Sequence, residues 1–168
     1  AGAGRARRAY PRARRPRRFA RNLVVTGAGP AGLVAAYIAA TVKAKVTLVE
    51  KHRMGGDCLN TGCVPSKALI KTARVLGQIR NAQAYGIKHA TAEIDFAEVM
   101  ERVQRVVREI EPHDSVERYT GLGVECLRGD ARISSPWTLE IDAAGEKKTL
   151  STRAIVIDQG RVVADKTP

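Results

Sequence analysis

The first apolar segment of the chain, Leu23 to Val42, contains twenty residues and no charge. That length suits a membrane span, but three glycines and one proline between positions 27 and 32 would break a single spanning helix. The pattern therefore favours a short strand at 23–25 that is buried on both faces, then a glycine turn and a helix from about Pro30 to Thr41. A second apolar run, at 46–49, predicts another strand.

Two stripes of apolar residues at helical spacing follow. The first, after Pro65, predicts a buried helix face made of Leu69, Ala73, Leu76 and Ile79. The second is preceded by Asp95 as a helix cap and is ended by Pro112. Its predicted buried face consists of Phe96, Val99, Met100, Val103, Val106, Val107 and Ile110.

Strand-like segments fill the last third of the chain. A strand is predicted at 124–127, with Cys126 as a buried and chemically inert thiol. Segments 137–141 and 147–150 predict a small hairpin, and the run at 155–157 predicts a return to the main sheet. The fold class is therefore α/β: a Rossmann-like domain with a parallel sheet and a small β-hairpin or meander insertion.

The turn after the first strand carries the motif G-x-G-x-x-G at 27–32. Gly27 suits the tight turn, Gly29 allows a pyrophosphate to approach the backbone, and Gly32 allows the helix to pack closely on the strand. The helix that begins there directs its N-terminus at the phosphates. Glu50, at the end of the second strand, suits the ribose hydroxyls and disfavours a 2′-phosphate. Together these features predict a dinucleotide-binding unit.

Cys58 and Cys63 lie five positions apart in the segment GGDCLNTGCVPSK, residues 55–67. On a regular helix that spacing separates the Cα atoms by roughly 8 to 9 Å, whereas a disulfide tolerates about 7 Å. A bridge would need a distorted first turn, which residues 60–62 suit. A metal site would need further ligands at suitable spacing, and two buried thiols remain an alternative. The pattern favours a redox dithiol, with a helix N-terminus lowering a thiol pKa.

The net charge of +12 is unevenly distributed, because nine arginines and no acidic residue lie in residues 1–21. We expect this arm to be disordered, since it has almost no apolar residue to bury. It could be a solvated tail, a targeting sequence or a nucleic-acid contact. The first is favoured, because the arm lacks serine and interleaved aromatic residues. Nucleic-acid binding is therefore disfavoured, and the glycines and proline at 27–32 likewise disfavour membrane insertion.

From about Asn22 to Ile157 the chain resembles the N-terminal FAD-binding half of the pyridine nucleotide-disulfide oxidoreductases, in the dihydrolipoamide dehydrogenase and mercuric reductase branch. The motifs that carry the resemblance are G-x-G-x-x-G, the strand-ending VEK at 49–51, and G-G-x-C-x-N-x-G-C-x-P-S-K at 55–67. Such enzymes pass electrons from NADH or NADPH to FAD, then to the cysteine pair, then to a disulfide or metal-ion substrate. The resemblance therefore implies FAD as cofactor and an oxidoreductase with a redox-active disulfide.

The resemblance also implies roles for individual residues. Cys63 would lie against the flavin as a thiolate, Cys58 would face the substrate, and Lys67 would lie near the reactive flavin edge, unless it is a solvated lysine. Asp57 replaces a threonine common in lipoamide dehydrogenases, which puts a direct side-chain contact with the pyrophosphate in doubt. The implied cofactor-binding residues are Gly27, Gly29, Pro30, Ala31, Gly32, Glu50, Lys51, Gly55, Gly56, Asp57 and Ala131.

The ends of the chain depart from the resemblance. We expect a disordered arm at 1–21, an FAD-binding domain at 22–157 and a divergent tail at 158–168, where Asp158 and Gln159 replace small residues. The nicotinamide and interface domains of such enzymes have no counterpart here, so we expect a partial chain with little turnover. A cytoplasmic location and, for the complete enzymes, a homodimer are implied. A basic binding module and a nonfunctional truncated chain remain alternatives.

Overall fold

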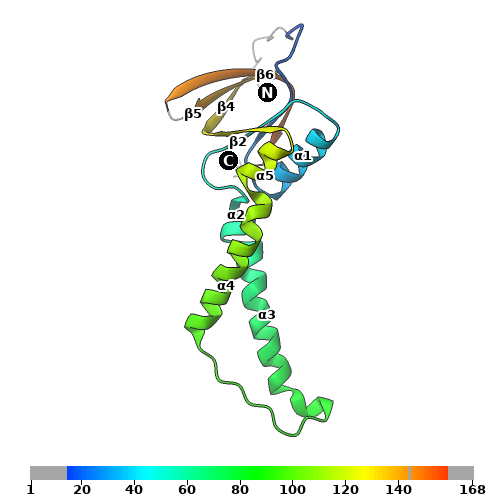
Figure 1. Cartoon of the computed structure of the whole chain (residues 1–168), viewed down its shortest axis with the longest axis vertical. Helices are drawn as coiled ribbons and strands as arrows, with labels where there is room; N and C mark the ends of the chain where they lie inside the picture. The colour runs from blue at the N-terminus through cyan, green and yellow to red at the C-terminus, as the bar shows by residue number, and fades with distance from the viewer. Residues whose placement is uncertain (1–14, 144, 159–168) are drawn as a thin grey trace, which may run out of the picture.

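The computed structural model describes residues 15–143 and 145–158 and contains one six-stranded sheet, in the order β3-β2-β1-β6-β5-β4 (Figure 1). Neighbouring strands among β3, β2, β1 and β6 run parallel, whereas β4, β5 and β6 form an antiparallel meander. The strands are β1 (Arg21–Thr26), β2 (Val46–Glu50), β3 (Val124–Arg128), β4 (Asp130–Ser135), β5 (Thr138–Ala143) and β6 (Glu146–Ile157). The predicted α/β class, with a parallel sheet and a meander insertion, is confirmed.

The central strands β1 and β2 are buried on both faces, as their uninterrupted apolar sequences predict. On one face, α1 (Pro30–Thr41) packs Leu33, Ala36 and Ala40 against a cluster that includes Val25 and Leu48. Removing such side chains from water contributes about 1.5 to 3 kcal/mol for each fully buried valine or leucine. This packing holds the N-terminus of α1 at the carboxyl end of β1.

The meander covers the opposite face of the parallel sheet. Leu139, Ile141 and Leu150 of the meander pack with Val24 and Val49 in a second buried cluster. Strand β6 serves both parts, because residues 146–151 pair with β5 and residues from 152 onward pair with β1. The second segment of the predicted hairpin, 147–150, and the predicted return strand at 155–157 therefore belong to one continuous strand.

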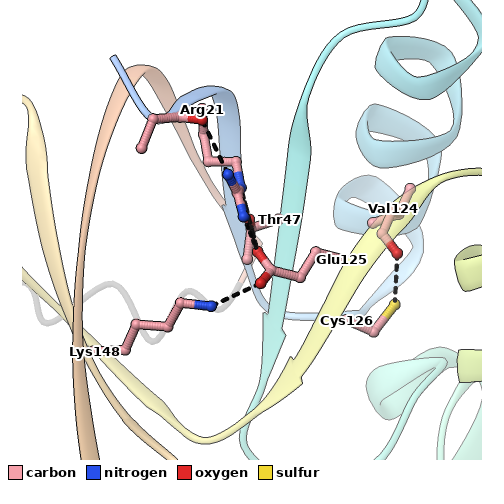
Figure 2. Close-up of polar contacts among 7 residues, drawn as sticks. Arg21, Thr47, Val124, Glu125, Cys126 and Lys148 are labelled. Carbon is pink, nitrogen blue, oxygen red and sulfur yellow. Dashed lines mark hydrogen bonds and ion pairs between the residues drawn. The ribbon is translucent and has the colours of Figure 1, made fainter. Parts of the chain in front are cut away.

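A polar cluster fastens the strands near the beginning of β1, β2 and β3 (Figure 2). Arg21 and Lys148 make ion pairs of 2.6 and 2.7 Å with the two carboxylate oxygens of Glu125. The hydroxyl of Thr47, which is fully buried, also donates a hydrogen bond to Glu125 at 2.6 Å. One carboxylate thereby links four strands.

Helices α3 (Cys63–Arg80) and α4 (Phe96–Ile110) extend away from the sheet as a long hairpin (Figure 1). They are joined by a 3-10 turn, η1 (Ala82–Tyr85), and an extended connection. The predicted face of α3 is partly wrong, because Leu69 and Ala73 are exposed whereas Ala68 is buried. Ala68 also accepts a hydrogen bond from Arg102 of α4 at its carbonyl oxygen. A small side chain at the contact therefore brings the two helices together.

The predicted stripe of α4 is also only partly buried. Val103 is buried, but Phe96 is 68% exposed and Met100 is exposed as well, because they lie toward the far end of the hairpin. The Asp95 side chain caps the helix by accepting from two backbone N–H groups, as predicted. The helix ends at Ile110, before Pro112. The chain then continues through η2 (Glu111–Asp114) and α5 (Val116–Gly121) to β3.

The boundary expected between the arm and the domain is shifted. Arg21 belongs to β1, and the Arg15 guanidinium lies over the rings of Phe19 and Trp137 at 5.7 and 5.3 Å. The end of the predicted arm therefore packs on the domain, while the predicted disorder of residues 1–14 lies outside the described residues. Within the part of the chain that the structure describes, no helix is long and apolar enough to cross a membrane.

Candidate cofactor and dithiol site

The glycine turn between β1 and α1 is held by the carboxylate at the end of β2. Glu50 is only 6% exposed, and its two oxygens accept hydrogen bonds from the backbone N–H groups of Ala28 at 2.6 Å and His52 at 2.7 Å. Gly27 adopts a φ of 97°, which glycine tolerates without steric strain, and its N–H donates to Val49. Glu50 thus shapes the predicted phosphate-binding turn, a role that its sequence position did not reveal.

Close packing explains the second and third glycines of the motif. A Cβ on Gly32 would collide with the carbonyl oxygen of Gly27, so only glycine lets α1 begin directly against the turn. A Cβ on Gly29 would lie 2.7 Å from a carboxylate oxygen of Asp158. The Asp158 carboxylate therefore lies in the space beside the turn, and the approach of a pyrophosphate to the Gly29 backbone stays a prediction.

The cysteine segment meets this turn through two further glycines. Gly55 caps α2 (Gly56–Asn60) with a φ of 81°, and Gly56 follows with a φ of 54°. A Cβ on Gly56 would lie 2.9 Å from the Cα of Gly29. The two segments are therefore in backbone contact, which places the start of α2 beside the start of α1.

The helical course is broken between the two cysteines. Cys58 lies in α2 and Cys63 begins α3, with Thr61 and Gly62 between the helices. The side chain of Asn60 donates to the carbonyl oxygens of Met54 and Gly56, which stabilises this break. The predicted distortion at 60–62 is thus confirmed. Both cysteines are free thiols, so the disulfide pairing stays a prediction.

The two thiols differ in environment. Cys58 is half-buried and its pKa is raised above the ordinary value, first because it shares a hydrogen bond with the Cys63 thiol and second because of burial. Lys67 acts in the opposite direction, since its positive charge lowers the Cys58 pKa. The lowering expected from a helix N-terminus is therefore not found at Cys58. Cys63 is exposed.

Two hollows flank the glycine turn. The larger has a volume of about 960 Å³ and is lined by most of the cofactor residues predicted at the starts of α1 and α2, together with Cys58 and Asp158. Its lining consists of Gly29, Pro30, Glu50, His52, Arg53, Gly56, Asp57, Cys58, Asn60, Thr61 and Asp158. The smaller, of about 630 Å³, includes Gly27, Lys51 and Ala131. Lys51 and Asp130, which both line this smaller hollow, make an ion pair with 2.6 Å between the lysine Nζ and the aspartate Oδ2.

Other predicted residues lie apart from these linings. Cys63 and Lys67 do not line either hollow, although both act electrostatically on Cys58. Cys126 is half-buried, its pKa is raised by burial, and its thiol contacts the carbonyl oxygen of Val124. The thiol predicted to be buried is therefore only half-buried, packed beside the core cluster of α1.

Sequence reasoning missed Asp158, which it assigned to a divergent tail. Its backbone N–H donates to Thr26 at 2.8 Å, so the pairing of β6 with β1 continues through this residue. Its side chain reaches the start of α1, where Oδ2 accepts from the backbone N–H of Gly32 at 2.7 Å. The available signal was an acidic residue directly after an apolar strand that borders β1, since such positions lie at the carboxyl edge of the sheet.

A parallel sheet with a glycine turn at a helix start, next to a segment with two neighbouring cysteines, is typical of nucleotide-binding proteins that carry out thiol chemistry. In agreement, residues 21–164 match the family described as pyridine nucleotide-disulphide oxidoreductase. The chain therefore belongs to the pyridine nucleotide-disulphide oxidoreductase family. Enzymes of this family are FAD-dependent and take electrons from NADH or NADPH.

Several dihydrolipoyl dehydrogenases are similar to the chain. That of Mycoplasma pneumoniae is 37% identical over 83% of this chain and 30% of its own length. That of Geobacillus stearothermophilus is 38% identical over 82% of this chain and 29% of its own length. That of Chlamydia trachomatis is 48% identical over a shorter region, 52% of this chain and 19% of its own length. The chain thus spans about 30% of the first two relatives.

Proposed function

We propose that the chain binds FAD at the glycine turn and carries, beside it, a dithiol that exchanges with disulfides. The backbone contact between Gly56 and Gly29 supports this most directly. It joins a turn suited to a diphosphate with the segment that bears Cys58. A structural turn and an unrelated pair of thiols would have no need of this contact.

The residues around the turn fit FAD. Gly29 and Gly56 bring backbone without side chains to the starts of α1 and α2, and the N–H groups and helix dipole at the start of α1 favour an anion. Glu50 and Asp57 line the larger hollow, while Lys51 and Ala131 line the smaller hollow on the other side of Gly27. We assign the diphosphate to the glycine turn, the ribose to Glu50 and the adenine to the region of Ala131. When bound, FAD supplies the two-electron chemistry that reduces the cysteine pair.

The cysteines can perform disulfide interchange by themselves. In the reduced pair, the Cys58 thiolate attacks one sulfur of a substrate disulfide and releases a thiolate, which leaves a mixed disulfide. Cys63 then attacks the Cys58 sulfur and releases the second substrate thiolate. Cys58 and Cys63 end as a disulfide, oxidised by two electrons, and the substrate ends as a dithiol. Lys67 assists by favouring the Cys58 thiolate.

The activity of the whole enzyme is proposed more broadly, because the chain spans about 30% of the first two relatives described above. We infer NADH or NADPH as the source of electrons and a small-molecule disulfide or a metal ion as their destination. A homodimer and a cytoplasmic location complete this proposal. Little turnover by the 168-residue chain alone remains part of it.

The test is protection of Cys58 by FAD. The chain is treated with iodoacetamide with and without saturating FAD, and the modified cysteines are quantified by peptide mass spectrometry. Cys58 should react at least about fivefold more slowly with FAD, because it lines the same hollow as Gly29. Cys126, on β3, provides the internal control and should react at an unchanged rate. An unchanged Cys58 rate at saturating FAD would contradict the proposed site.

A further inference from the structure

Asp158 places a negative charge at the start of α1. Its Oδ2 accepts from the Gly32 N–H at 2.7 Å and lies 2.7 Å from the position of a Cβ on Gly29. The corresponding distance for a Cβ on Gly32 is 2.8 Å. The carboxylate therefore fills the space that these two glycines keep open.

The same space is where the proposed function places the diphosphate of FAD. The first backbone N–H groups of α1 have no partners within the helix and attract anions, and Asp158 satisfies one of them. Asp158 also lines the larger hollow together with Gly29, Pro30 and Glu50. A carboxylate fixed at this point occupies a hydrogen-bond donor and repels any second anion brought beside it.

We propose that Asp158 is an intramolecular anion that competes with the diphosphate of the dinucleotide for the N-terminus of α1 and so lowers the affinity of the site. This inference rests on the proposed function, because it requires FAD to bind at the glycine turn. Binding must break the hydrogen bond from Gly32 or accommodate two anions at one helix start. Either route weakens binding relative to a chain with an uncharged side chain at position 158.

The backbone of Asp158 supports this competition. Because its N–H is held by Thr26 at the sheet edge, the residue cannot move far from α1 without breaking the pairing of β6 with β1. Rotation of the Asp158 side chain is the smallest movement that takes its carboxylate away from Gly29 and Gly32 and so opens the start of α1 to another anion. A residue that merely caps the helix would affect only stability, whereas a competing anion affects stability and affinity in opposite directions.

The experiment compares the native chain with Asp158→Ala and Asp158→Asn by calorimetric titration with FAD, ADP and adenosine. We expect Asp158→Ala to bind FAD and ADP about tenfold more tightly, from the loss of a helix-end contact and of anion repulsion. Asp158→Asn, which keeps an acceptor oxygen without the charge, should also bind more tightly than the native chain. Adenosine, which has no phosphate, should bind all three chains equally.

Two controls separate charge from fold. Glu109→Gln removes one negative charge from an exposed position on α4 and should leave FAD affinity unchanged. The advantage of Asp158→Ala should shrink as salt rises from about 20 mM to about 0.2 M, because the Debye length shortens. Thermal unfolding should show the Asp158→Ala chain to be folded but less stable than the native chain.

The outcomes distinguish this inference from the function on which it rests. If the native chain binds FAD and Asp158→Ala binds it no more tightly, the competition is refuted while FAD binding stands. If neither folded chain binds FAD or ADP, the proposed function is refuted and the inference falls with it. Tighter binding of FAD and ADP, but not of adenosine, supports both.

Discussion

Arg21 and Glu125 lie 104 positions apart in the chain, yet the Arg21 guanidinium donates two hydrogen bonds, at 2.6 and 3.2 Å, to one carboxylate oxygen of Glu125 (Figure 2). The other oxygen accepts from Lys148 at 2.7 Å. Burial alone would raise the pKa of Glu125, but hydrogen bonds from Lys148, Thr47 and Arg21 lower the pKa to about 2. The cluster therefore needs an ionised carboxylate.

The first prediction concerns acid stability. Since the folded pKa of Glu125 lies below its ordinary value of 4.5, the ionised group stabilises the fold above about pH 4.5, and this contribution is lost as the pH falls toward about 2. Glu125→Gln should lower the free energy of unfolding near neutral pH by about 1 to 2 kcal/mol, a value reduced for solvent screening. Urea unfolding at several pH values measures this. A difference between native chain and variant that does not shrink in acid would contradict it.

The second prediction concerns Glu50. A glutamine there offers one acceptor oxygen to two backbone N–H groups, those of Ala28 and His52, and turns its NH₂ group toward the other. Glu50→Gln should lower the free energy of unfolding by about 1 to 3 kcal/mol and weaken FAD binding. Denaturant unfolding and FAD titration check the two effects. Glu140→Gln, an exposed position on β5, is the matched control. An equal effect of both variants would remove the special role of Glu50.

The third prediction concerns the hydrogen bond within the dithiol. Because this bond is the largest cause of the raised Cys58 pKa, Cys63→Ala should lower that pKa and speed alkylation of Cys58 near neutral pH. Peptide mass spectrometry of chains treated with iodoacetamide measures the rate at Cys58, with Cys126 as the internal reference. A slower reaction of Cys58 in this variant would show that Cys63 lowers the Cys58 pKa instead of raising it.

The fourth prediction concerns Lys67. Its charge lowers the Cys58 pKa, so Lys67→Met should raise that pKa and slow alkylation of Cys58 near neutral pH. Lys71→Met removes the same charge from an exposed position about one turn further along α3 and should have a smaller effect. Equal rates in the two variants would indicate that Lys67 is a solvated helix lysine.

Local sequence patterns predicted the elements around the site well. The apolar strand, the glycine turn and the helix at 30–41 follow from chemistry within a few residues, and so does the cap at Asp95. The break between Cys58 and Cys63 was also predictable, because a regular helix cannot bring these positions together.

Contacts between distant segments were not predictable in the same way. The buried face of α3 includes Ala68 instead of the predicted Leu69, because a small residue lets α4 approach closely. The periodicity of apolar residues does not reveal where a partner helix packs. The contact of Asp158 with Gly32 depends on the register of β6 beside β1, which no local pattern encodes. For the same reason the link between Arg21 and Glu125 appeared only in the folded chain.

FAD titration of glycine variants, followed by the change in flavin absorbance and fluorescence, tests the central claim most directly. Gly29→Val fills the space beside the turn, and Gly29→Val combined with Asp158→Ala removes the clash with the carboxylate while keeping the valine. Gly77→Val, on α3 where nothing lies within 4 Å of an added Cβ, is the control. We predict FAD binding by the native chain and Gly77→Val, and none by the two folded Gly29 variants. FAD binding of native strength by the double variant would contradict a diphosphate site at the glycine turn.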